Sequence, residues 1–83
     1  MNQEEFQNRI AVAANRTWQA IGGDVLRAAE ADSIPRDEVV ECVMGHLEDF
    51  GGDKEAVQQF RGLAYEEEVA VLTKAFPFDR YGF

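Results

Sequence analysis

Cys42 and His46 are the side chains of this sequence best suited to bind a transition metal. They stand four residues apart, a spacing that places them on one helical stripe with Glu38 and Asp49. Thiolate and imidazole both suit Zn²⁺, but a structural zinc site needs four ligands, and a second copy of the chain would have to complete it. We therefore expect no metal site, with Cys42 and His46 at the boundary between an apolar and an acidic face.

The segment from Asp49 to Glu55 has a superficial likeness to a calcium-binding loop. Such a loop requires glycine at its sixth position and a carboxylate at its twelfth. Counted from Asp49, those positions hold Lys54 and Phe60 instead. The segment is better interpreted as a turn followed by a helix that Asp53 caps.

Catalytic chemistry has little support in this sequence. His46 is the single histidine, and the chain has no Gly-rich phosphate loop, H-E-x-x-H or G-x-S-x-G motif. Acid–base or nucleophilic catalysis needs a base within reach of its partner, and no such constellation is evident. We expect a protein that is not an enzyme and uses no cofactor.

The charge of the chain points instead to binding. The net charge is −8, and residues 30–55 carry nine carboxylates against two basic side chains, a balance of −7. Such a surface disfavours contact with nucleic acid or an anionic membrane and favours a protein with a basic surface. The acidic residues expected to make this contact lie on one helix: Glu38, Glu41, Glu48 and Asp49. The alternative is a DNA mimic, which would inhibit a nucleic-acid-binding protein through its carboxylates alone.

The last eight residues hold four of the nine aromatic side chains of the chain. A chain end is normally polar and frayed, whereas aromatic side chains are common anchors of interfaces. Two interpretations remain open: this tail, residues 77–83, covers the end of its own domain, or it contacts another protein. For the second, the expected contact residues are Phe78, Arg80, Tyr81 and Phe83.

Hydrophobic periodicity predicts an all-α fold, a compact bundle of four short helices, or five if the first segment divides. Asn2 and Glu5 fit a capping box, and an apolar stripe continues from Phe6 towards Ala31 across Gly22-Gly23. The preserved phase favours one helix with a kink, and the two glycines favour two helices. We expect one helix with a kink. Arg9 and Arg16 lie on its flank, and we expect them to pair with acidic residues of the second helix.

The remaining helices are bounded by glycine and proline. The second follows Pro35 and ends at Gly51-Gly52, and its predicted apolar face runs from Val39 to Phe50. Two further stripes are displaced by about 100° around a common helix axis, which indicates a break at Gly62. The predicted helices lie near 54–61 and 64–76; Phe60 falls on the first stripe, Tyr65 and Phe76 on the second, and Pro77 stops the last helix.

Length and composition limit the class of protein. The 83 residues form one domain, 1–83, whose small core makes association into a homodimer a natural way to bury surplus apolar surface. The chain shows no secretory signal and no membrane span, and its single cysteine fits a reducing cytoplasm. We expect a cytoplasmic, non-enzymatic module that binds, and thereby occludes or locks, a larger protein; a purely structural homo-oligomer is a further alternative.

Overall fold

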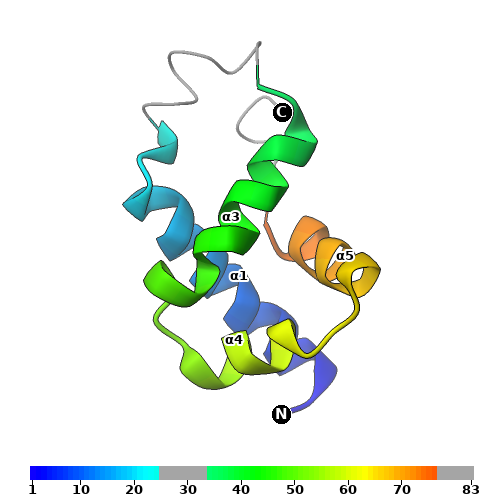
Figure 1. The fold of residues 1–83 in the computed structure, drawn as a ribbon. Coiled ribbons are helices and arrows are strands. Elements are labelled where there is room, and N and C mark those ends of the chain that lie inside the picture. Colours follow the sequence, from blue (N-terminus) through cyan, green and yellow to red (C-terminus); the bar gives the residue numbers. More distant parts are fainter. Residues whose placement is uncertain (25–33, 77–83) are drawn as a thin grey trace.

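The computed structural model describes residues 1–24 and 34–76 of the chain (Figure 1). This part contains four helices and no strand, so the prediction of an all-α bundle of four helices is confirmed. The helices are α1 (Gln3–Ala20), α3 (Arg36–Phe50), α4 (Lys54–Arg61) and α5 (Tyr65–Ala75).

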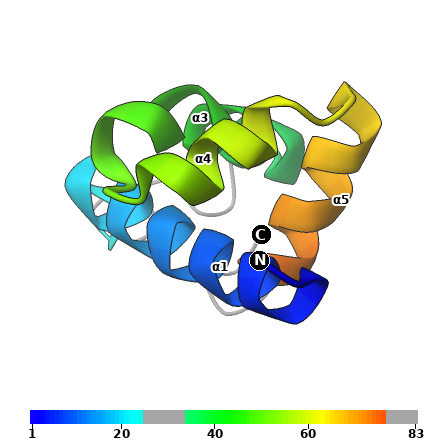
Figure 2. The same cartoon turned by 90° about the horizontal axis from the view of Figure 1, so that it is seen from below.

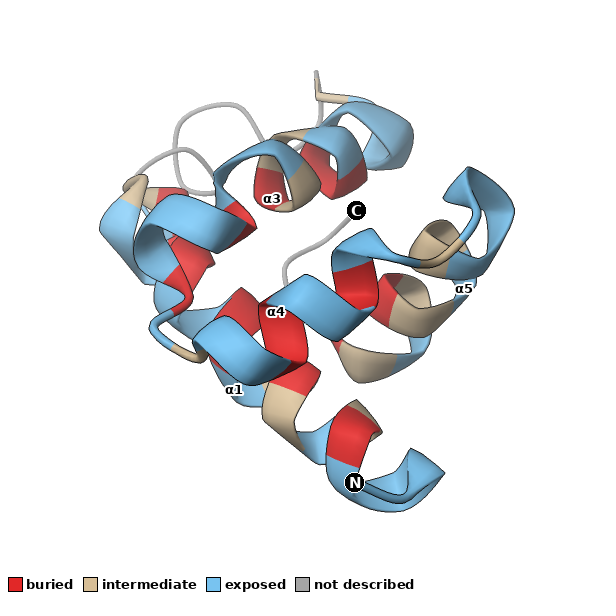
Figure 3. Cartoon of the chain, turned by 60° about the horizontal axis from the view of Figure 1, so that its bottom comes forward, coloured by how far each residue is buried: buried red, intermediate tan, exposed pale blue. Residues whose placement is uncertain are grey.

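Helix α1 is the longest of the four described helices and, like α3, contacts each of the other three. It lies on one side of the bundle, α3 and α4 lie on the other, and α5 closes the side between them (Figure 2). The buried residues of all four helices face inward and form one hydrophobic core (Figure 3). None of the helices in the described residues is both long enough and apolar enough to span a membrane.

Helix α1 begins as the sequence predicts and ends earlier than expected. The side chain of Asn2 accepts a hydrogen bond of 2.7 Å from the backbone N–H of Glu5. Gly22 has a φ of +81°, in the left-handed region, so the prediction of one helix continuous across Gly22-Gly23 is wrong. The apolar stripe of the sequence continues in phase across the two glycines, but such a stripe does not prevent glycine from ending a helix. The part of that prediction covering residues 25–31 lies outside the described residues.

Helix α3 buries the apolar face that its periodicity predicts, except at its end. Val39, Val40, Val43 and Leu47 are buried. Phe50 is 44% exposed and lies beside His46, with the two ring centroids 5.9 Å apart. The expectation that Phe50 completes the apolar face is wrong, because it occupies the last turn of α3, just before the chain turns away into α4.

The turn into α4 confirms the predicted helix boundaries. Gly52 has a φ of +80°, and Asp53 caps α4 by accepting a hydrogen bond from the backbone N–H of Ala56. Helix α4 ends at Arg61, so the predicted break at Gly62 is correct. Phe60 in this helix is buried, as its stripe indicates.

Of the two aromatic residues predicted on the apolar stripe of α5, Phe76 is buried and Tyr65 is exposed. Phe76 directly follows the helix, is 1% exposed and meets the Trp18 ring edge-on, with centroids 5.9 Å apart. Its extended backbone is the conformation favoured for a residue that precedes proline. Tyr65 was expected on the apolar stripe but is 57% exposed, because it is the first residue of α5 and its hydroxyl points to an acidic side chain of α3.

Candidate partner-binding face

The outer side of α3 carries all four acidic residues that the sequence singled out. Each of them is exposed, on the opposite side of the helix from the buried Val39, Val43 and Leu47. In Figure 1, α3 lies at the front, and no other described helix crosses this side. We call this surface the acidic face; it comprises Glu38, Glu41, Gly45, Glu48 and Asp49.

Gly45 lies at the centre of the acidic face. Apart from the adjacent residues and the backbone of its own helix, no atom of the described residues comes within 4 Å of the position that a Cβ atom would occupy there. A glycine inside a helix lowers stability by about 0.5–1 kcal/mol relative to alanine, so it is normally retained for close packing or a special backbone conformation. Gly45 is helical and exposed, and neither reason is found in the described part of the fold.

Two members of the acidic face already have partners within the bundle. Glu41 accepts a hydrogen bond of 2.9 Å from the Tyr65 hydroxyl, and this bond to a carboxylate raises the pKa of Tyr65. Glu48 forms an ion pair with Arg61 of α4, at 3.5 Å. Glu38 and Asp49 make no such contact with another described side chain.

Cys42 and His46 lie at the edge of the acidic face, as their spacing predicts. Cys42 is half-buried and His46 is exposed. Within residues 1–24 and 34–76, no group of three or more potential ligand side chains is placed to hold a metal ion.

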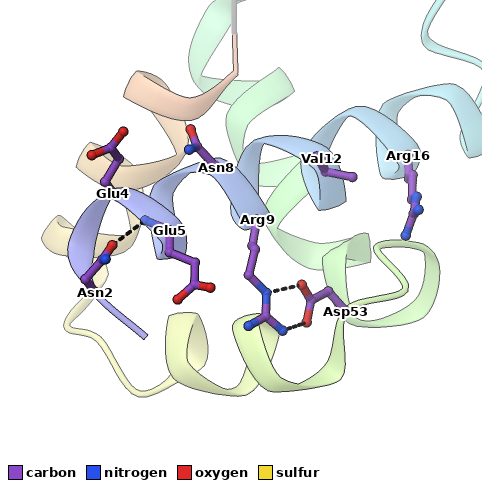
Figure 4. A pocket seen from close by; sticks show the side chains of 8 residues that line it. All are labelled: Asn2, Glu4, Glu5, Asn8, Arg9, Val12, Arg16 and Asp53. Carbon is purple, nitrogen blue, oxygen red and sulfur yellow. Dashed lines mark hydrogen bonds and ion pairs between the residues drawn. The ribbon is translucent and has the colours of Figure 1, made fainter.

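The expected pairing of Arg9 with acids of the second helix is wrong. Arg9 donates to both carboxylate oxygens of Asp53, at 2.6 and 2.7 Å, and to Glu55 at 2.9 Å (Figure 4). These partners belong to the start of α4, where a cap and a first-turn carboxylate are placed for local reasons. The hydrogen bonds raise the pKa of Arg9 and lower that of Asp53. Sequence reasoning missed this pair because it assigned Asp53 only to the cap.

Arg16 lies further along the same side of α1. One of its guanidinium nitrogens is 3.0 Å from the position of a Cβ atom on Gly52, so this arginine also reaches the turn between α3 and α4. The hollow that Figure 4 shows beside Arg9 and Arg16 is shallow and mixed in charge, with Glu4, Glu5 and Asp53 around it. It contains no arrangement of a base beside a nucleophile.

A second hollow, the α3–α4 groove, lies between the end of α3 and the outer side of α4. It has a volume of about 550 Å³. It is lined by eight residues: Glu48, Asp49, Gly52, Asp53, Lys54, Val57, Gln58 and Arg61. Sequence reasoning missed it because a groove between two helices needs their relative placement, although the acidic residues of one of its sides had been identified.

The four tail residues expected to bind a partner, Phe78, Arg80, Tyr81 and Phe83, lie outside the described residues, as does the whole of 77–83. Their role stays a prediction. Phe76, the first aromatic residue of that run, belongs to the core.

No protein-family model matches the chain, and no curated protein or solved structure shows significant similarity to it.

Proposed function

We propose that this protein is a non-enzymatic binding module that docks through the acidic face of α3 onto a basic surface of a larger protein, which it occludes or locks. Gly45 carries the proposal: it is an exposed, mid-helix glycine surrounded by carboxylates. A residue that lowers helix stability without serving the described fold is explained if another chain approaches the helix backbone there.

Charge supports this choice of partner. Two of the carboxylates, Glu38 and Asp49, have no described side chain to neutralise them. Complementary charge speeds the encounter with a basic surface and excludes acidic competitors. With a net charge of −8, two copies of the chain repel each other, so the acidic face suits a different protein better than a second copy.

The cytoplasmic location, the homodimer and the contribution of the aromatic tail are further parts of the proposal. A homodimer would bury its own surface elsewhere than on the acidic face. The tail would add aromatic anchors to an interface that the acidic face orients.

The experiment compares two double variants with the same change in net charge. One is Glu38→Gln with Asp49→Asn, on the acidic face; the control is Glu66→Gln with Glu67→Gln, two exposed acids in the first turn of α5. Wild type and both variants are immobilised, proteins from the native cells are captured quantitatively, and the affinity of each captured protein is then measured with purified components.

We expect the face variant to bind its partner at least about fivefold more weakly, a loss of about 1 kcal/mol, and the control to bind nearly as wild type. If both variants lose the same affinity, and binding weakens steeply as salt is raised, the DNA-mimic alternative is favoured, because total charge then dominates the affinity. Capture of no partner, together with a stable multimer by light scattering, would favour the purely structural homo-oligomer.

A further inference from the structure

The α3–α4 groove adjoins the acidic face, since Glu48 and Asp49 belong to both. Val57 lines the bottom of the groove, and only its edge reaches the surface, since the residue is 4% exposed. Gly52 adds backbone without a side chain. The groove contains three carboxylates. Asp53 is held by Arg9, so Glu48 and Asp49 are the two that face an incoming group, beside the surface proposed to meet a basic protein.

The ion pair between Arg61 and Glu48 across this groove is loose. Its closest nitrogen–oxygen distance is 3.5 Å, whereas the Arg9–Asp53 pair closes to 2.6 Å. The Arg61 and Glu48 side chains are 45% and 69% exposed. Exposed pairs with such geometry contribute little and exchange readily with solvent or with another ion. Glu48 thus retains capacity for a better-placed donor.

Asp49 strengthens the case for a second donor. It follows Glu48 directly, lines the same groove and makes no ion pair with a described side chain. One guanidinium from outside could contact both carboxylates, because its five N–H groups are arranged in a planar fork.

We propose that the α3–α4 groove receives an arginine side chain of the binding partner, and that Arg61 is an internal competitor for Glu48. The entering guanidinium binds Glu48 and Asp49, and the apolar part of the arginine side chain lies along the bottom of the groove, beside Gly52 and Val57. This inference rests on the proposed function, for which it names one contact of the partner.

Arginine suits the groove better than lysine. The guanidinium is planar and weakly hydrated, so it loses less on entering a partly apolar groove, whereas an ammonium is a compact and strongly hydrated charge. Lys54, at the start of α4, also lines the groove and repels a second cation there. The groove is therefore matched to one arginine side chain and not to a run of basic residues.

The test uses the full chain, labelled with ¹⁵N, and a capped Gly-Arg-Gly-Arg-Gly peptide as the probe, with its lysine counterpart for comparison. Amide shifts are followed during titration of wild type, Arg61→Gln and Lys74→Gln. The Lys74→Gln control removes the same charge from an exposed position at the end of α5, away from the groove. Thermal unfolding of each variant verifies that the fold is kept.

We expect the arginine peptide to shift the amides of Asp49, Gly52 and Val57 and to bind more tightly than the lysine peptide. Arg61→Gln should tighten binding about two- to fivefold more than Lys74→Gln does, the range expected when an exposed ion pair no longer competes. Equal effects of the two substitutions, or equal binding of the two peptides, would overturn the inference.

The two proposals fail in different ways. Shifts at Glu41 and Gly45 without shifts at Gly52 and Val57 would overturn the groove but keep the acidic face as the docking surface. Shifts spread evenly over all exposed acids, including Glu66 and Glu67, would contradict both.

Discussion

Arg9 and Asp53 link the first helix to the turn that starts α4. Two nitrogens of the Arg9 guanidinium donate to the two carboxylate oxygens of Asp53, at 2.6 and 2.7 Å. One of these oxygens also accepts the backbone N–H of Ala56, at 3.2 Å. A single carboxylate thus caps α4 and links the start of that helix to α1.

Substitutions of Asp53 separate its two roles, which are to cap α4 and to pair with Arg9. Asparagine keeps the capping oxygen but loses the charge that Arg9 binds, whereas alanine loses both. We expect Asp53→Ala to lower the free energy of unfolding by about 1–2 kcal/mol and Asp53→Asn to lower it by less. Urea unfolding followed by Trp18 fluorescence measures both. Equal losses in the two variants would show that the cap contributes nothing.

The same pair predicts how stability depends on pH. Hydrogen bonding from Arg9 lowers the pKa of Asp53 below its ordinary value of 3.8 in the folded chain. The contribution of this pair to stability is therefore fully present well above the unfolded pKa of 3.8, and it is lost as the pH falls through the lowered pKa, where the folded carboxylate takes up its proton. Between pH 7 and pH 2, wild type should lose more stability than Asp53→Asn. An equal loss of stability in wild type and in Asp53→Asn would contradict a lowered pKa of Asp53.

Gly23 is required by the packing of Trp18. A Cβ atom on Gly23 would overlap the indole ring of Trp18. Gly23→Ala must displace Trp18, which is 1% exposed and central to the core. We expect a loss of about 1–3 kcal/mol, the usual effect of overpacking, and a red shift of Trp18 emission. An unchanged unfolding midpoint would show that the ring relaxes freely.

Phe76 and the residues that follow it should have separable effects. Phe76→Ala removes a fully buried ring that contacts Trp18, and we expect a loss of about 3–5 kcal/mol, enough to unfold much of the chain. A chain that ends at Pro77 keeps Phe76 and should remain folded, while losing partner affinity if the tail binds. Thermal unfolding and binding are measured on both variants. Unfolding of the shortened chain would assign Phe78, Tyr81 and Phe83 to the core instead.

The sequence predicted helices where a boundary is enforced locally. Asn2, Asp53 and Gly62 act through their own backbone or one nearby hydrogen bond, so the ends they mark could be identified without a fold. Phe50 and Tyr65 were misplaced because periodicity gives the direction of a side chain, not whether a neighbouring helix covers it. Gly22 was misjudged for a related reason, since an apolar stripe in phase does not report the backbone conformation of a glycine.

The acidic residues of the site could be predicted, and the groove could not. Glu38, Glu41, Glu48 and Asp49 follow from helical spacing within one segment. Arg61 and Val57 join Glu48 only through the packing of α4 against α3. Contacts of this kind depend on tertiary placement, which no local pattern encodes.

Gly45 provides the sharpest test of the acidic face, because it separates stability from binding. Gly45→Ala should raise the free energy of unfolding by about 0.5–1 kcal/mol, since the methyl group enters open space. A larger side chain at the same place should leave the fold intact and obstruct an approaching chain. Ala70→Tyr, at an exposed position of α5, is the matched control for added bulk.

The most direct measurement is therefore the affinity of Gly45→Tyr for the captured partner, compared with wild type and Ala70→Tyr. We predict that Gly45→Tyr unfolds at or above the wild-type temperature and loses at least about tenfold in affinity, equal to about 1.4 kcal/mol, while Ala70→Tyr binds normally. Undiminished binding by a folded Gly45→Tyr chain would contradict the claim that the acidic face of α3 is the docking surface.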